Sequence, residues 1–246
     1  MQCWGITDPG CVREQNQDTF QIEYLDRDTA LCIVCDGMGG TKSGNVASSL
    51  ATEVFVGEVR RTWVNNMDQS QIDQMLQAAV KLANFTVNDQ GRQFEEFYGM
   101  GTTLVAALIK DREITIANVG DSRAYMINSD GIRKVTIDHS LVEMMVLRGE
   151  LTPEEARTYP GKNYITRAVG TESVVECDLY HVDAEQGDCL LLCSDGLSNI
   201  IDEQEILFEV VHGTEKADCC RQLLEIAKNR GAPDNVTCVL TQIGTV

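Results

Sequence analysis

The sequence predicts an α+β fold with largely antiparallel sheets. Short apolar strands cluster in succession along the chain, and paired helical stretches lie between the clusters. No internal repeat, low-complexity segment or linker rich in Pro, Gly and Ser divides the 246 residues, and only four prolines are present. We therefore expect residues 1–246 to form one domain.

The first half of the chain predicts strands, then two helices, then strands again. The first three strands are expected over residues 3–7, 18–25 and 30–36. Helices follow over roughly 43–66 and 70–90, the second with a capping-box-like start at Ser70 and Asp73. Apolar residues at helical spacing support this second helix. Further strands are expected over 102–109, 113–120, 123–128 and 132–137.

The strand pattern breaks at residues 138–163 and then resumes. This break contains a capping box at Thr152 to Glu155, with proline at the first helical position. Strands are expected again at 177–184 and 188–196, and the last at 235–243. Between them, one helix should start at Asp202, where Glu205 completes another box, and a second should span about 215–230.

Composition predicts a soluble globular protein of the cytoplasm. The chain is 43% hydrophobic and 24% charged, and it has no apolar run near the ~18 residues that a membrane span needs. The N-terminus has no basic segment followed by an apolar one, so we expect no signal peptide. Ten cysteines without an export signal indicate a reducing cytosol. A formal charge of -18 argues against nucleic acid or an anionic membrane as partner.

Several common catalytic and metal motifs are missing. No cysteine is followed six positions later by arginine, and no G-x-S-x-G, Walker A or G-x-G-x-x-G segment occurs. The three histidines do not have zinc-motif spacing. Cys32 and Cys35 form a C-x-x-C, but residues three apart on a strand point to opposite faces. Two buried thiols are therefore the default interpretation, with a redox or zinc site as the alternative.

Four aspartates sit at the ends of predicted strands. Asp36 follows the apolar run "LCIVC" and precedes a glycine, and Asp195 repeats this design in "CLLLCSDG". Asp234 and Asp18 lie directly before strands. A single aspartate at a strand end is usually a turn residue, but two copies of the same design are harder to explain in that way.

If these carboxylates converge, their mutual repulsion requires a cation. An all-oxygen ligand set favours Mg²⁺ or Mn²⁺. Gly37 would let a backbone carbonyl approach the same ion.

Eight segments in order make the chain resemble the metal-dependent protein phosphatase family, the protein phosphatase 2C or PPM type. They are "TDPGCVREQNQD", "DGMGG", "GTTLVAAL", "ANVGDSRAY", "DHSLV", "NYITRAVGT", "CSDGL" and "APDNVT". The insert after "DHSLV", about residues 140–165, is similar to the flap of bacterial serine/threonine phosphatases. The resemblance implies a four-layer α-β-β-α sandwich of two antiparallel sheets flanked by paired helices.

The resemblance also implies a metal site, whose ligands would be Asp18, Asp36, Gly37, Asp121, Asp195 and Asp234. Asp36 would bridge two ions, Asp195 and Asp234 would complete one of them, and Asp18 with the Gly37 carbonyl would hold the other. Asp121 together with Asp195 would hold a third, weaker ion. The alternative for Asp121 is a turn residue in "NVGDSR".

The implied activity is hydrolysis of phosphoserine and phosphothreonine in proteins. A water bridging the two ions would attack phosphorus in line, without a covalent phosphoenzyme. Arg13 would bind the substrate phosphate, because a guanidinium fork matches phosphate oxygens. Without the motif, Arg13 would be interpreted as a solvated surface residue. Expected partners are phosphorylated proteins, those of a bacterial serine/threonine kinase, and the enzyme is expected to be a monomer.

Two positions depart from the family's pattern. Thr41 stands where many bacterial relatives have histidine, and Gln17 stands where glutamate is common. These departures leave the general acid open but do not remove a metal ligand. Ser140 in "DHSLV" is interpreted as a turn residue before a helix, not a nucleophile. A pseudophosphatase that only binds a partner, and a phosphatase dedicated to one partner in stress or sporulation signalling, remain alternative functions.

Overall fold

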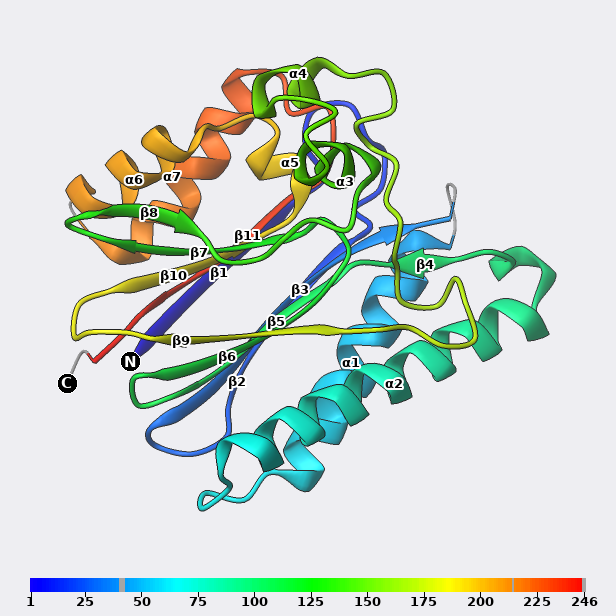
Figure 1. The fold of residues 1–246 in the computed structure, drawn as a ribbon, viewed down its shortest axis with the longest axis horizontal. Helices are drawn as coiled ribbons and strands as arrows, with labels where there is room; N and C mark the ends of the chain where they lie inside the picture. Colours follow the sequence, from blue (N-terminus) through cyan, green and yellow to red (C-terminus); the bar gives the residue numbers. More distant parts are fainter. Residues whose placement is uncertain (40–42, 214, 245–246) are drawn as a thin grey trace.

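The computed structural model describes residues 1–39, 43–213 and 215–244, and it has two antiparallel sheets packed face to face (Figure 1). One sheet has the order β1 (Gln2–Asp8), β11 (Val236–Gln242), β10 (Cys189–Cys193), β7 (Arg123–Asn128), β8 (Gly131–Lys134). The other has the order β2 (Asp18–Tyr24), β3 (Thr29–Met38), β5 (Leu104–Lys110), β6 (Glu113–Val119), β9 (Asp178–Asp183), and β4 (Gly101–Thr102) pairs with β3.

Paired helices cover the outer face of each sheet (Figure 1). The long helices α1 (Gly44–Thr62) and α2 (Gln69–Gln93) pack on the β2–β9 sheet, and the short η1 (Glu95–Phe97) follows them. The opposite sheet is covered by α6 (Glu203–His212) and α7 (Lys216–Asn229), and α5 (Asp195–Ser198) follows β10. The remaining helices, α3 (Leu141–Leu147) and α4 (Pro153–Thr158), lie in the 140–165 segment. This arrangement confirms the predicted four layers.

The apolar core is divided into three clusters that match these layers. One lies between the sheets, and one lies between each sheet and its helices. The run before Asp36 contributes to two of them, because alternate residues of a strand face opposite sides. Cys35 belongs to the cluster under α1 and α2, whereas Cys32 belongs to the cluster between the sheets. All ten cysteines are free thiols, in agreement with the default interpretation.

Helix starts follow the predicted caps with one correction. The boxes at Thr152 and at Asp202 are formed as predicted. Helix α2, however, is capped by Asp68 and not by Ser70, because the Asp68 side chain accepts from the Gln71 backbone N and Gln71 Oε1 accepts from the Asp68 N, both at 2.9 Å. A capping box is recognised from only two residues three positions apart, so several start points fit this part of the sequence. The earlier one, Asp68 with Gln71, makes both hydrogen bonds. In the same way Ser140 caps α3 by accepting from the Glu143 N at 3.2 Å, as expected for a turn residue.

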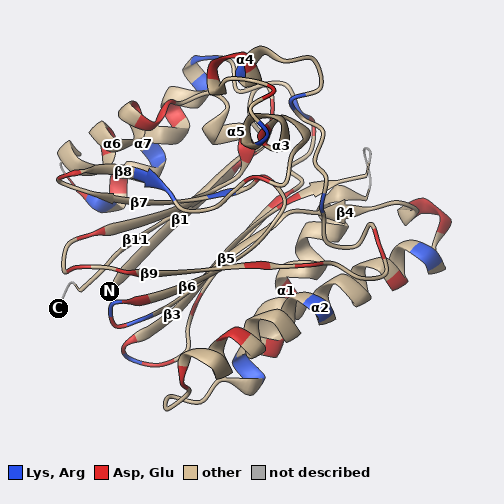
Figure 2. Cartoon of the chain, in the orientation of Figure 1, with Lys and Arg blue, Asp and Glu red and all other residues tan. Residues whose placement is uncertain are grey.

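Acidic side chains are spread over helices and loops of both halves of the molecule (Figure 2). The chain has 38 acidic and 20 basic residues. Only five of the acidic residues belong to the predicted metal site, so most of the negative charge lies elsewhere. Within the described ranges, no helix combines the length and the apolar character that a membrane crossing requires.

Candidate active site

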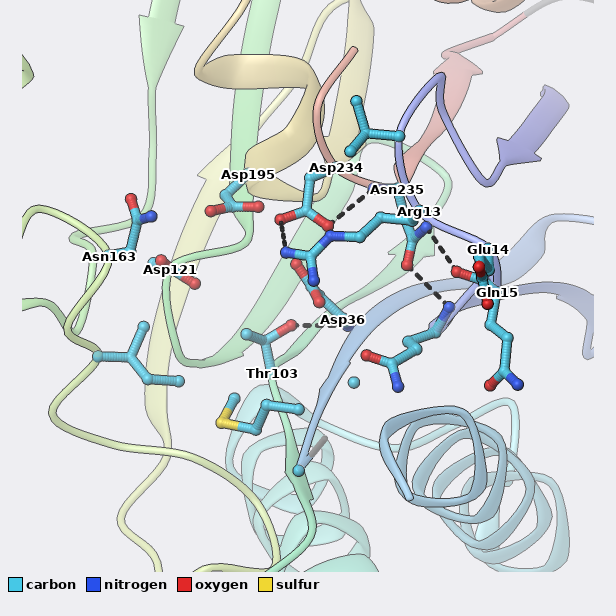
Figure 3. A pocket seen from close by; sticks show the side chains of 16 residues that line it. Arg13, Glu14, Gln15, Asp36, Thr103, Asp121, Asn163, Asp195, Asp234 and Asn235 are labelled. Atoms are coloured by element: carbon cyan, nitrogen blue, oxygen red, sulfur yellow. Dashed lines mark hydrogen bonds and ion pairs between the residues drawn. The ribbon is translucent and has the colours of Figure 1, made fainter. Parts of the chain in front are cut away.

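A cavity of about 540 Å³ opens where the two sheets meet at one end. Six of the seven residues predicted for the site line it: Arg13, Asp36, Gly37, Asp121, Asp195 and Asp234. Figure 3 shows the four carboxylates facing one space, with Arg13 beside Asp234. The seventh, Asp18, lies directly behind this space as the register partner of Asp36 on β2. The structure therefore brings together residues from distant parts of the sequence.

Asp36 is held through its backbone and not at a strand end. Strand β3 continues to Met38 because Gly37 and Met38 pair with β4. The Asp36 N donates to Thr103 Oγ1 at 2.9 Å, and the Asp36 carbonyl accepts from the Thr103 N at 2.8 Å. These bonds fix where the Asp36 carboxylate enters the cavity.

The glycines after Asp36 and Asp195 allow backbone segments to approach closely. A Cβ at Gly37 would overlap the carbonyl oxygen of Gly44 at the start of α1. A Cβ at Gly196 would overlap the carbonyl oxygen of Asn235. The repeated Asp-Gly design thus has a packing reason: each glycine lets an aspartate-bearing segment lie against a neighbouring segment of the site.

Asp18 is buried with incomplete hydrogen bonding. Its side chain is only 6% exposed, and its Oδ2 accepts from Ser194 Oγ at 2.8 Å. Its Oδ1 has no hydrogen-bond partner within the described part of the chain. Burial, with a smaller contribution from the charges of Asp195 and Asp234, raises the pKa of Asp18 to about 6. An unpaired buried carboxylate oxygen fits a ligand for a cation.

Three carboxylates of the cavity, those of Asp36, Asp121 and Asp195, also have raised pKa values. Burial, followed by the negative charges around it, raises the pKa of Asp36 well above its usual range. Burial and the charge of Asp195 raise the pKa of Asp121 to about 7, and burial and the charge of Asp234 raise the pKa of Asp195. A metal-free site at neutral pH therefore favours uptake of protons or of divalent cations.

The carboxylates line one cavity, but the described residues do not form a complete metal-binding cluster. No three His, Cys, Asp or Glu side chains among the described residues stand close enough to form a ready-made metal site. Arg13 also lines the cavity, where its Nη2 pairs with Asp234 Oδ2 at 2.9 Å. The donor set of hard oxygens fits Mg²⁺ or Mn²⁺, and ion binding would draw the carboxylates together.

Asn235 is a site residue that the sequence analysis missed. Its Nδ2 donates to the carbonyls of Pro9 and Gln15, both at 3.0 Å, and its Oδ1 accepts from the Gln17 N at 2.8 Å. These bonds fasten the loop that carries Arg13 beside Asp234. The available signal was its position next to Asp234 in "APDNVT".

Thr103 and Ser194 were missed as well. Both residues are buried. The Thr103 hydroxyl accepts from the Asp36 backbone N, and the Ser194 hydroxyl donates to the Asp18 carboxylate. Of the two departures from the family pattern, Gln17 lines the cavity. Thr41 lies outside the described residues.

The structure thus combines an acidic cavity with an α-β-β-α sandwich. The family model described as "Protein phosphatase 2C" matches residues 12–240. The chain therefore belongs to the protein phosphatase 2C family, whose members are metal-dependent serine/threonine protein phosphatases using Mn²⁺ or Mg²⁺.

Curated relatives and solved structures agree with this family. "Serine/threonine phosphatase stp" of Listeria innocua is 37% identical, over 96% of this chain and 93% of the relative. "Protein phosphatase PhpP" of Streptococcus pneumoniae is 36% identical, over 97% and 96%. The crystal structure of serine/threonine phosphatase Stp1 from Staphylococcus aureus superposes with a TM-score of 0.93 at 38% identity, covering 99% of this chain and 95% of that one. The Mycobacterium tuberculosis phosphatase PstP/Ppp gives 0.86 at 33% identity, with 99% of each chain covered.

Proposed function

We propose that this cavity hydrolyses phosphoserine and phosphothreonine in proteins with two divalent cations, and that a third ion binds more weakly. The observation that carries the proposal is the convergence of Asp36, Asp121, Asp195 and Asp234 on one cavity, with Asp18 buried behind it. Repulsion among these carboxylates at neutral pH is relieved by protons or by bound cations, and divalent cations are the compensation that the proposed chemistry uses.

The ligand assignment is the one that the resemblance to the family implies for these residues. Asp36 would contact both core ions, with Asp195 and Asp234 on one ion, and Asp18 and the Gly37 carbonyl on the other. Asp121 would hold the weaker ion together with Asp195. The ions, when bound, supply Lewis-acid activation of the attacking water and screen the negative charge of the phosphoryl oxygens.

Arg13 is proposed to bind the substrate phosphate. Its side chain is 54% exposed at the rim of the cavity, so it can leave Asp234 without a large burial penalty. Its guanidinium can donate two parallel hydrogen bonds to a phosphate and so orient the phosphorus above the carboxylates. Asn235 supports this role, because it holds the loop in which Arg13 lies.

The proposed substrates are proteins phosphorylated by a bacterial serine/threonine kinase. We further propose that the enzyme works as a monomer in the cytoplasm, with residues 1–246 forming one catalytic domain and residues 140–165 acting as a flap. The Listeria innocua and Staphylococcus aureus relatives named as serine/threonine phosphatases support phosphoserine and phosphothreonine as the substrate class.

The rival function is a pseudophosphatase that binds a partner without hydrolysis. One experiment separates the two: phosphate release from a phosphothreonine peptide by chelator-treated protein, with and without added Mn²⁺. We expect release only with Mn²⁺, and none from Asp36→Asn. Asp130→Asn, a charge-matched change in the exposed turn between β7 and β8, should behave as the unaltered protein does. No release under any metal condition from folded protein would favour the rival.

A further inference from the structure

Two residues without a role in the proposed chemistry hold Asp121 from both sides. Asp121 lies in the turn between β6 and β7, preceded by Gly120 and followed two residues later by Arg123. The "DHS" motif that precedes α3 makes two of the contacts to this segment, His139 to Gly120 and Asp138 to Arg123. Neither is assigned to a metal or to the phosphate.

His139 binds both backbone polar groups of Gly120. Its Nδ1 accepts from the Gly120 N at 3.0 Å, and its own backbone N donates to the Gly120 carbonyl at 2.9 Å. The imidazole is buried, with 7% of its surface exposed. The turn itself is tight, because Gly120 has a φ of +107° and a Cβ there would press on Thr103.

The other ring nitrogen of His139, Nε2, faces Asp178 and Arg167. Nε2 lies 3.1 Å from both Asp178 Oδ2 and Arg167 Nη1. Because Nδ1 accepts from the Gly120 N, the proton is assigned to Nε2, which then donates to Asp178 Oδ2. The Asp178 carboxylate is in turn oriented by Arg167, whose Nη1 donates to Oδ1 at 2.7 Å. Burial lowers the pKa of His139, and the nearby charges of Asp178, Arg167 and Asp138 act on it more weakly. The neutral ring is thus a stable acceptor for Gly120.

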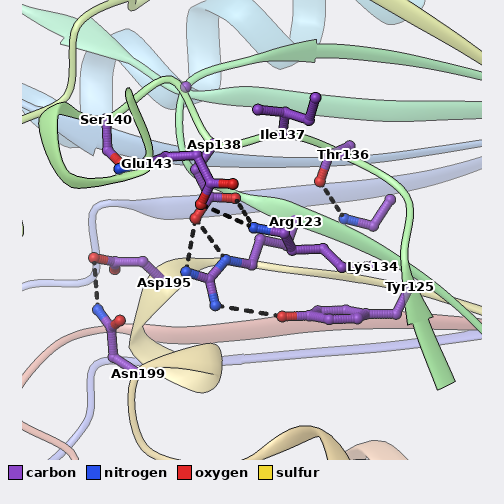
Figure 4. Close-up of polar contacts among 12 residues, drawn as sticks. Arg123, Tyr125, Lys134, Thr136, Ile137, Asp138, Ser140, Glu143, Asp195 and Asn199 are labelled. Atoms are coloured by element: carbon purple, nitrogen blue, oxygen red, sulfur yellow. Dashed lines mark hydrogen bonds and ion pairs between the residues drawn. The ribbon is translucent and has the colours of Figure 1, made fainter. Parts of the chain in front are cut away.

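Asp138 holds the other side of the same turn (Figure 4). Its Oδ2 accepts from Arg123 Nε at 2.8 Å and from Nη2 at 2.7 Å. Its Oδ1 accepts from Lys134 Nζ at 3.3 Å. The carboxylate is 5% exposed and paired with two cations, so Arg123 is fixed in place. Adjacent residues therefore bond to the turn before and after Asp121.

The same residues form the base of the 140–165 segment. The His139 carbonyl accepts from the Thr166 N at 2.7 Å, and Ser140 pairs with Ile165. Leu141 N donates to the Tyr164 carbonyl at 2.8 Å. A displacement of this base would be transmitted directly to Gly120, since His139 bonds to both.

We propose that Asp138 and His139 are positioning residues that fix Asp121 for the weaker ion and link its occupancy to the base of the 140–165 segment. The inference rests on the proposed role of Asp121. If it fails, His139 is only a buried polar group whose hydrogen bonds satisfy the fold.

The test compares His139→Asn with His139→Gln. Asparagine places its Oδ1 where Nδ1 stood and keeps an acceptor for the Gly120 N. Glutamine places its amide where Nε2 stood and leaves that N–H unpaired. Hydrogen exchange of the Gly120 amide in metal-free protein and Mn²⁺ titration by calorimetry are the two readouts, and neither depends on turnover.

We expect His139→Gln to speed Gly120 exchange about tenfold or more and to weaken the weakest Mn²⁺ site by a similar factor, as for a lost buried hydrogen bond. His139→Asn should stay near the unaltered protein in both, and the two core ions should bind alike in all three proteins. Equal behaviour of the two variants would overturn the inference.

Asp121→Asn separates this inference from the proposed function. If Asp121→Asn leaves all Mn²⁺ binding unchanged, the assignment of the third ion fails. If Asp121→Asn removes the weak site but the His139 variants do not differ, the positioning role alone fails. Should both His139 variants be unfolded, a ¹⁵N–¹⁵N coupling across the Gly120 N to His139 Nδ1 hydrogen bond tests the same geometry in the unaltered protein. Absence of that coupling, or a proton on Nδ1, would refute it.

Discussion

Replacing Asp18 with asparagine should remove a pH-dependent destabilisation of the metal-free protein. Asp18 is buried, one of its oxygens is unpaired, and its pKa is raised from 3.8 to about 6. The folded protein therefore keeps the Asp18 proton over a pH range in which the unfolded chain has lost it. Stability is full below about pH 4 and falls as the pH rises toward about 6.

The magnitude follows from this shift. Well above pH 6 the difference between the two pKa values corresponds to about 3 kcal/mol, because one unit is worth about 1.4 kcal/mol. At about pH 4.5 only about 1 kcal/mol of this is present, because that pH is less than one unit above the unfolded-state pKa of 3.8. Asp18→Asn should thus gain about 2 kcal/mol relative to the unaltered protein between about pH 4.5 and about pH 7.5. For a domain of this size that corresponds to roughly 4–8 °C in Tm.

The assay is urea unfolding of both proteins in chelator at the two pH values. The difference in unfolding free energy between the variant and the unaltered protein at one pH removes the contributions of the other titrating groups. The change in this difference between the two pH values removes any pH-independent effect of the amide. Added Mn²⁺ should stabilise the unaltered protein at neutral pH far more than the variant. A stability difference between the two proteins that does not change with pH would refute the electrostatic reasoning.

Three further substitutions test separate parts of the site. Arg13→Ala should raise KM for a phosphopeptide by about tenfold with a smaller change in kcat, because it removes binding shared by the ground and transition states; an unchanged KM contradicts the role. Gly37→Ala should destabilise the fold by about 3 kcal/mol or more in chemical unfolding, since its Cβ overlaps the Gly44 carbonyl, and native stability would show that the approach is not tight. Ser194→Ala should destabilise chelated protein by about 1–3 kcal/mol by removing the hydrogen bond to Asp18, and equal urea midpoints would exclude this contribution.

Local sequence pattern was sufficient for the strands, although β3 continues two residues beyond Asp36, which was expected at its end. The run before Asp36 is apolar at every position because β3 is buried on both faces, and a continuous apolar run is a strong strand signal. The helix boundaries were predicted less well: α1 ends at Thr62, short of the expected residue 66. The start of α2 depends on which of several polar residues makes the cap, and sequence spacing alone does not decide it.

The missed residues act through contacts between distant segments. Asn235 bonds to backbone atoms of the N-terminal loop, and Ser194 bonds to Asp18, 176 positions away in sequence. Single buried amides and hydroxyls have no periodic signal, so nothing short of the folded structure identifies their partners. The repeated Asp-Gly design and the resemblance to the family indicated which carboxylates to group, whereas no sequence signal indicated the pairing of Arg13 with Asp234.

The most direct test of the metal site is anomalous diffraction from crystals of this protein soaked in Mn²⁺. The assignment predicts two strong peaks that share Asp36, one also in contact with Asp195 and Asp234, the other with Asp18 and the Gly37 carbonyl. Crystals of Asp36→Asn grown and soaked in the same way should lose both peaks or retain them at greatly reduced height. Peaks that lie outside the cavity, or full phosphatase activity from protein whose cavity takes up no Mn²⁺, would contradict the account.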